Sequence, residues 1–111
     1  MTDPSPEYEI RIGATARKEM RALGPAAAAE IVVAVDQKLR RHPAQRGAPL
    51  SGELAGYRRL MVRRWRVVYV VEERRVLVLV LAVGKRAAGD LENIYDRLSG
   101  GELERRRAEL E

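Results

Sequence analysis

The sequence predicts a small α+β domain in which an antiparallel β-sheet packs against an N-terminal helical hairpin, in the order β-α-α-β-β-β-α. Three observations support this fold class. Apolar residues recur at helical spacing in the first half of the chain, and strand-like runs with short connections fill the second half. The chain has 111 residues, a length that fits one domain over 1–111.

The first half of the chain is typical of a strand followed by two helices. Residues 7–12 alternate polar and apolar side chains, which is the period of a half-buried strand, and residues 14–23 change to helical spacing. Gly24 and Pro25 fit the end of one helix and the start of the next, because proline suits the first helical position. The second helix is expected over residues 26–41, before a proline that cannot continue it.

The second half predicts the sheet and a C-terminal tail. A loop rich in glycine and proline leads into three strand-like runs, at residues 57–62, 65–71 and 75–83. The last run is apolar throughout 76–83, which indicates a central strand covered on both faces. A short helix is expected at about 91–98. Residues 99–111 have little apolar face, so they are predicted to form a charged helical tail that frays or docks on something else.

The composition excludes several kinds of site. The chain has no cysteine and one histidine, His42, which excludes a disulfide framework, a thiolate zinc site, a cysteine nucleophile and a His-rich metal site. The apolar runs are too short to span a bilayer, and the N-terminus is acidic and prolyl, unlike a signal peptide. We therefore expect a cytoplasmic protein with no metal, no cofactor and no membrane partner.

Positive charge is concentrated in the middle of the chain. The formal net charge is +5, but residues 38–86 carry thirteen basic and three acidic residues, a net of +10, and the remainder carries −5. Eighteen of the 21 basic residues are arginine, whose planar guanidinium suits phosphate contacts. This segment indicates a polyanionic partner, with nucleic acid the first candidate. The alternative interpretation is a composition that simply prefers arginine on solvated faces.

Three segments in the second half match motifs of one known family. Residues 50–60 fit L-x-G-x-L-x-G-x-R-R-L, residues 65–69 fit Y/W-R-V-x-Y, and residues 83–86 fit V-G-x-R. With similar helical segments at 16–23 and 39–43, the chain resembles the RelE/ParE toxin superfamily in one colinear order over residues 8–95. The fold that the resemblance implies is the one predicted above from patterning.

The resemblance implies a toxin of a bacterial type II toxin–antitoxin system. Relatives in the RelE-like branch are metal-independent mRNA interferases, endoribonucleases that inhibit translation by cutting messenger RNA in the ribosomal A site. The 2′-hydroxyl attacks the adjacent phosphodiester and leaves a 2′,3′-cyclic phosphate. This reaction needs a base for the 2′-hydroxyl, cations for the extra phosphate charge and an acid for the departing 5′-oxygen. The implied partners are the ribosome, mRNA and an acidic antitoxin that buries the basic surface and wraps the helical hairpin.

The same resemblance suggests the site residues. Arg66 falls on the family's central arginine, and Arg86 falls on its strand-end arginine, where bidentate phosphate contact is feasible. Tyr95 is the candidate for acid–base or base-stacking duty, because relatives often place a tyrosine on the C-terminal helix. Additional RNA or phosphate contacts are expected from Arg58, Arg59, Arg63, Arg64 and Lys85.

Strand alternation constrains two of these expectations. Only one of Arg58 and Arg59 can face the cleft, and Arg58 is favoured because it follows the tyrosine that matches the family's aromatic residue. Lys85 is expected to point to the face opposite Arg86.

Several alternatives stay open. Arg66 could pair structurally with Glu72 or Glu73 across the hairpin, and Tyr95 could be a packing residue with a wet hydroxyl. Relatives in the ParE branch share the fold and poison DNA gyrase without cutting RNA. A degenerate member that binds its partner but has lost toxicity is a third reading. The set of arginines favours the endoribonuclease, because a gyrase inhibitor has no need to converge cations on one groove.

Overall fold

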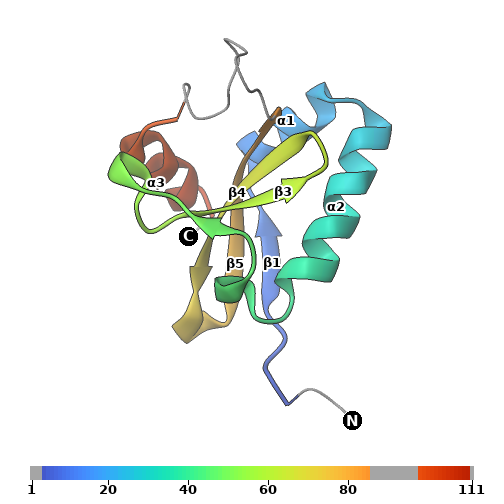
Figure 1. Ribbon diagram of the computed structural model, residues 1–111. Coiled ribbons are helices and arrows are strands. Elements are labelled where there is room, and N and C mark those ends of the chain that lie inside the picture. Colours follow the sequence, from blue (N-terminus) through green and yellow to red (C-terminus); the bar gives the residue numbers. More distant parts are fainter. Residues whose placement is uncertain (1–3, 86–97, 111) are drawn as a thin grey trace.

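The fold class predicted from the sequence is confirmed in a computed structural model that describes residues 4–85 and 98–110 (Figure 1). The first half contains β1 (Glu9–Ile12), α1 (Ala14–Ala22) and α2 (Pro25–Leu39). The second half contains β2 (Ala48–Pro49), β3 (Arg58–Val62), β4 (Trp65–Glu72), β5 (Leu77–Lys85) and α3 (Gly100–Ala108). Short 3-10 turns lie at Pro43–Gln45, Gly52–Leu54 and Glu73–Arg75.

The sheet has five strands in the order β1-β5-β4-β3-β2. The pairs β2–β3, β3–β4 and β4–β5 are antiparallel, as expected, but β1 lies parallel to β5. The sheet is therefore mixed, with its parallel pair at the β1 edge. The helical hairpin and the strands β2 to β4 lie between β1 and β5 in the sequence. The two-residue strand β2 adds a further edge within the segment that the sequence predicted to be a loop.

Helices cover both faces of this sheet (Figure 1). On one face α1 and α2 bury Met20, Ile31 and Leu39 against Tyr69 and Val80. On the other face α3 buries its Leu103 against a second cluster that includes residues of β4 and β5. All residues of β5 except the last are buried, which confirms a central strand covered on both faces.

The C-terminal tail docks on the protein itself. Ser99 caps α3, because its hydroxyl accepts a hydrogen bond from the Glu102 backbone N–H at 3.1 Å. Leu98, Leu103 and Leu110 supply the apolar contacts of this docking. The sequence did not indicate these contacts, because the segment is charged and has few apolar positions. The short helix expected at 91–98 falls almost wholly outside the described residues, as do Arg86 and Tyr95.

Candidate functional site: two arginines on the α3 face of the sheet

Arg59 and Arg66 lie on the same face of the sheet. In the β3–β4 pair Arg59 is opposite Val68, and Met61 is opposite Arg66. Val68 packs in the cluster beneath α3, so strand alternation puts both arginines on the α3 face. They are diagonal neighbours, a relationship that typically separates residues by about 7–8 Å. Both residues are half-buried, and the Arg66 Nη1 is itself a buried atom. Two guanidinium groups at this spacing suit one phosphate or two adjacent ones.

Arg58 lies on the opposite face, which makes the expectation that it shares a cleft with Arg66 wrong. It pairs with Tyr69, a residue of the core beneath α1 and α2. Its Nε and Nη2 donate to the Arg46 carbonyl oxygen at 3.1 and 2.8 Å. Arg58 therefore anchors the loop before β2, and Arg59 is the member of the pair that faces the candidate site.

Tyr69 completes this loop anchor. Its hydroxyl lies 2.9 Å from the Pro43 carbonyl oxygen and 2.8 Å from that of Arg46. Burial raises the pKa of the Tyr69 hydroxyl, and the adjacent Arg58 only partly offsets this effect. The hydroxyl consequently stays protonated and remains a hydrogen-bond donor to the loop.

The strand geometry contradicts the alternative in which Arg66 pairs with Glu72 or Glu73 across the hairpin. Glu72 lies six residues along the same strand, a separation of about 20 Å, and Glu73 is farther away. Glu72 instead pairs with Arg75 at 3.3 Å and with Arg107 of α3 at 3.2 Å. Arg66 therefore lies beyond the reach of both glutamates, at the end of β4 where Gly84 of β5 is its partner.

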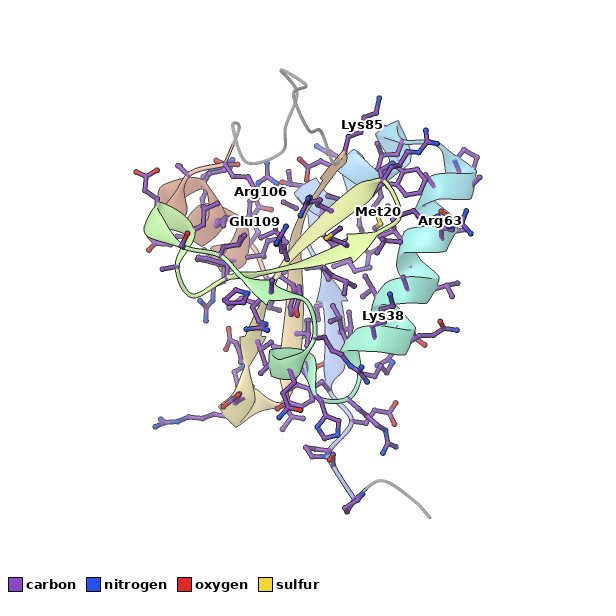
Figure 2. All side chains as sticks on the ribbon, viewed as in Figure 1. Met20, Lys38, Arg63, Lys85, Arg106 and Glu109 are labelled. Atoms are coloured by element: carbon purple, nitrogen blue, oxygen red, sulfur yellow. The ribbon has the colours of Figure 1, made fainter. Side chains whose placement is uncertain are left out.

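The remaining predicted cations lie in the β3–β4 turn and at the end of β5. Arg63 and Arg64 form the exposed turn between β3 and β4, where Arg63 adopts a left-handed backbone and contacts Glu30 of α2 at 3.3 Å. Lys85 is exposed at the end of β5 (Figure 2), paired with Trp65, which packs on the core beneath α1 and α2. By strand alternation Lys85 therefore faces away from Arg66. The structure thus brings together Arg59 and Arg66 but separates Arg58 and Lys85 from them.

A second surface feature is an apolar groove between α2 and β3, with a volume of about 470 Å³. Val33 is 53% exposed and Met61 is 41% exposed, and both line it. Lys38 and Arg63 lie toward its two ends (Figure 2). The groove was not predicted from the sequence. The apolar run at 31–35 could have indicated it, because this run is too wide for one buried helical stripe.

Two searches of the described residues bear on other kinds of site. Within residues 4–85 and 98–110, His, Asp and Glu side chains nowhere gather in threes that would hold a metal ion. Over the same residues, each helix is too short or too polar to cross a membrane.

Comparison with known proteins identifies a family and relatives. The model of the ParE toxin of type II toxin–antitoxin systems, parDE, matches residues 10–89. Toxin RelG of Mycobacterium tuberculosis (strain ATCC 25618 / H37Rv) is 32% identical over 80 residues, which are 72% of this chain and 92% of that protein. These matches confirm the resemblance seen in the sequence, and α3 begins after the segment that the family model covers.

Two solved structures agree with this result. A chain in the crystal structure of the toxin–antitoxin complex RelBE2 from M. tuberculosis has a TM-score of 0.70 and 31% identity, covering 78% of this chain and 100% of that one. An arginine-to-alanine double variant of the Escherichia coli toxin RelE in the free state has a TM-score of 0.61 and 25% identity. That match covers 83% of this chain and 99% of the relative.

Proposed function

We propose that this chain, which belongs to the ParE toxin family of type II toxin–antitoxin systems, is a RelE-like endoribonuclease that cleaves messenger RNA in the ribosomal A site. The observation that supports cleavage is the placement of Arg59 and Arg66 as diagonal neighbours on one face of the sheet. Two guanidinium groups at this spacing suit a phosphodiester that gains negative charge in the transition state.

The proposed reaction is an intramolecular transfer of the phosphate. The 2′-hydroxyl gives its proton to a base, its oxygen forms a bond to phosphorus, and the bond from phosphorus to the 5′-oxygen breaks. Arg59 and Arg66 stabilise the negative charge on the non-bridging oxygens, because arginine stays protonated at every physiological pH. Following the family resemblance, Arg86 is proposed to add a third cation and Tyr95 to protonate the departing 5′-oxygen or stack on a base.

The partner of a type II toxin is an antitoxin, and one of the similar solved chains is part of a toxin–antitoxin complex. We propose that apolar side chains of an acidic antitoxin fill the groove between α2 and β3, while its carboxylates meet Lys38 and Arg63 at the groove ends. Affinity for the antitoxin should then fall as salt rises, because exposed charges are screened. Binding that is independent of salt between low and high ionic strength would contradict this interface.

A gyrase poison remains the second candidate function, because the matching family model is that of a ParE toxin. The two functions make opposite demands on Arg59 and Arg66. Phosphoryl transfer requires both cations at the reacting phosphate, whereas a protein that only binds gyrase needs no convergent pair.

The decisive experiment adds the purified protein to stalled ribosomes that carry a defined mRNA and maps new 5′ ends by primer extension. We expect cuts within the A-site codon that are lost in Arg66→Ala and Arg86→Ala. Arg74→Ala is the matched control, because Arg74 is exposed in the turn at the other end of β4. Intact mRNA from a protein that still arrests growth would refute cleavage, and a supercoiling assay would then test gyrase.

A further inference from the structure

Within residues 4–85 and 98–110, the end of β5 next to Arg66 has no neighbouring strand on its outer side. The pairing of β1 with β5 ends at Ile12 and Val80, where the Gly13 N–H donates to the Val80 carbonyl oxygen at 2.9 Å. On the inner side Val68 pairs with Ala82 and Tyr69 pairs with Val80, so Leu81 is the extra residue of a β-bulge. Among the described residues, the backbone from Leu81 onward therefore keeps β4 on its inner side but has no strand on the side where β1 holds the first part of β5.

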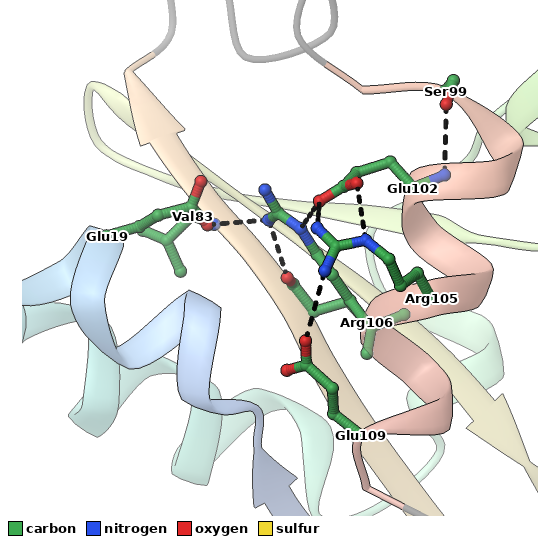
Figure 3. A network of polar contacts seen from close by, with 8 residues as sticks. Glu19, Val83, Ser99, Glu102, Arg105, Arg106 and Glu109 are labelled. Carbon is green, nitrogen blue, oxygen red and sulfur yellow. Dashed lines mark hydrogen bonds and ion pairs between the residues drawn. The ribbon is translucent and has the colours of Figure 1, made fainter.

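Two side chains from opposite faces of the sheet take the place of that missing strand (Figure 3). Glu19 of α1 accepts a hydrogen bond from the Val83 N–H at 3.1 Å. Arg106 of α3 donates to the Leu81 carbonyl oxygen at 3.1 Å, and its Nη1 lies 3.0 Å from the Glu19 carboxylate. A parallel neighbour would supply one donor and one acceptor to these backbone groups, and the ion pair supplies both.

The ion pair between Glu19 and Arg106 is largely buried, and a third residue, Glu102, also holds it in place. The side chains of Arg106 and Glu19 are 11% and 17% exposed, so solvent screens their interaction less than that of a surface pair. Glu102 binds the Arg106 Nε at 2.9 Å and thereby fixes the direction of the guanidinium. Charge-assisted hydrogen bonds of this kind are stronger than neutral ones, which suits a fixed support.

We propose that Glu19 and Arg106 are positioning residues that hold the end of β5 in register with Arg66. Val83 directly precedes Gly84, and Gly84 is the cross-strand partner of Arg66, so the backbone held by the pair is the backbone beside the candidate site. Arg106 lies beyond residues 10–89, so this support comes from a helix outside the family match. The inference rests on the proposed function where it concerns cleavage, but the backbone support itself does not depend on it.

The test compares Arg106→Ala with Arg105→Ala in the full chain. Arg105 is its neighbour on α3 and also binds Glu102, but it is 63% exposed, and its ion pairs are with Glu102 and with Glu109 at the C-cap of the same helix. We expect amide hydrogen exchange at Val83 and Gly84, followed by NMR, to accelerate at least tenfold in Arg106→Ala and in Glu19→Ala, and to stay unchanged in Arg105→Ala. Equal exchange in Arg106→Ala and Arg105→Ala would overturn the proposal.

Single-turnover cleavage on saturating ribosomes, measured well below the unfolding temperature, tests the link to the site. Arg106→Ala should cleave about 10-fold to 100-fold more slowly, because a small misplacement of the reacting groups has an effect of this size on the rate. Its affinity for the ribosome should be unchanged. Arg106→Lys keeps a charge that can reach Glu19 and should recover part of the rate, and it substitutes for the alanine variant if that fails to fold. Full-rate cleavage by Arg106→Ala would overturn the positioning role, whereas absence of cleavage in the unmodified protein would overturn the proposed function and leave the exchange test intact.

Discussion

Arg58 and Tyr69 donate hydrogen bonds to the same acceptor, the carbonyl oxygen of Arg46. The Arg58 Nη2 and the Tyr69 hydroxyl each lie 2.8 Å from that oxygen. One side chain comes from β3 and the other from the facing position of β4. Together they tie the loop before β2 to the sheet on the side of the helical hairpin. The adjacent Arg59 points to the other side, so two consecutive arginines have different roles.

The first prediction separates these two roles. Arg58→Ala should lower the free energy of unfolding by about 1 kcal/mol, the typical net value of such a hydrogen bond, and keep most of the cleavage activity. Arg59→Ala should leave stability nearly unchanged and reduce cleavage by about 100-fold, as the loss of one preorganised cation or donor does. Urea denaturation and primer extension on ribosomes measure the two quantities. The reverse pattern would show that Arg58, and not Arg59, faces the RNA.

The orientation of this arginine pair shows what the sequence leaves undetermined. Alternation predicts that one of the two faces the site, but the choice depends on the register of β3 against β4, which only the assembled sheet sets. The helices and β5 were predictable because helical spacing and a continuous apolar run are local patterns. The parallel placement of β1 and the bulge at Leu81 arise from contacts between distant segments, and local patterns do not encode them.

The candidate site was predictable to the extent that motifs mark it. Arg66 is found from the motif at 65–69, and the structure adds its diagonal relation to Arg59. The support from Arg106 could not be anticipated, since α3 has a single fully buried residue, Leu103, in a run of charges. One well-placed leucine is enough to dock a short helix whose arginines then reach Glu19 and Glu72.

The second prediction concerns the buried hydroxyl of Tyr69. Tyr69→Phe should lower the free energy of unfolding by about 1–3 kcal/mol, because it removes the hydroxyl that hydrogen-bonds to two carbonyl oxygens in a buried site. Tyr57→Phe serves as a comparison from the α3 side of the sheet, away from the loop. The loop itself reports the cause: amide exchange at Ala48 should rise only in Tyr69→Phe. A Tyr69→Phe variant as stable as the unmodified protein would contradict this role.

The third prediction concerns Gly47, the glycine that immediately precedes β2. Gly47 has a φ of +58°, and a Cβ at this position would lie 2.0 Å from the Arg59 carbonyl oxygen. Gly52 has a similar φ of +62° but open space around it, so it is a matched control. Gly52→Ala should cost about 1 kcal/mol from backbone strain alone, and Gly47→Ala should cost clearly more, since β2 must move away from β3. Equal losses in urea denaturation would refute the steric argument.

The fourth prediction is a pH dependence from Glu72. Burial raises the pKa of this carboxyl, but the hydrogen bonds and charges of Arg107 and Arg75 outweigh burial and hold its pKa below the ordinary value. A carboxyl with a lowered pKa stabilises the fold fully above the unfolded-state value of about 4.3, and this contribution is lost as the pH falls below it. Thermal unfolding should therefore show Glu72→Gln less stable than the unmodified protein at pH 7.

The same measurement at lower pH supplies the check on this linkage. Between pH 5 and about pH 3 the difference between Glu72→Gln and the unmodified protein should shrink, because protonation removes the ion pairs that the substitution has already removed. Glu73→Gln, in the exposed turn that follows, is the control for the substitution itself and should leave stability at pH 7 nearly unchanged. A difference that stays constant with pH would show that the ion pairs with Arg75 and Arg107 do not stabilise the fold.

The fifth prediction tests the groove between α2 and β3 as the antitoxin surface. Val33 and Val32 are adjacent and similarly exposed, at 53% and 45%, but only Val33 lines this groove. Val33→Asp places a carboxylate among apolar side chains and beside the acidic partner proposed here, so affinity for the antitoxin should fall at least tenfold. Val32→Asp has the same charge change on a neighbouring part of α2 and should bind normally. If titration calorimetry shows that both variants bind the antitoxin equally well, its apolar side chains occupy another surface.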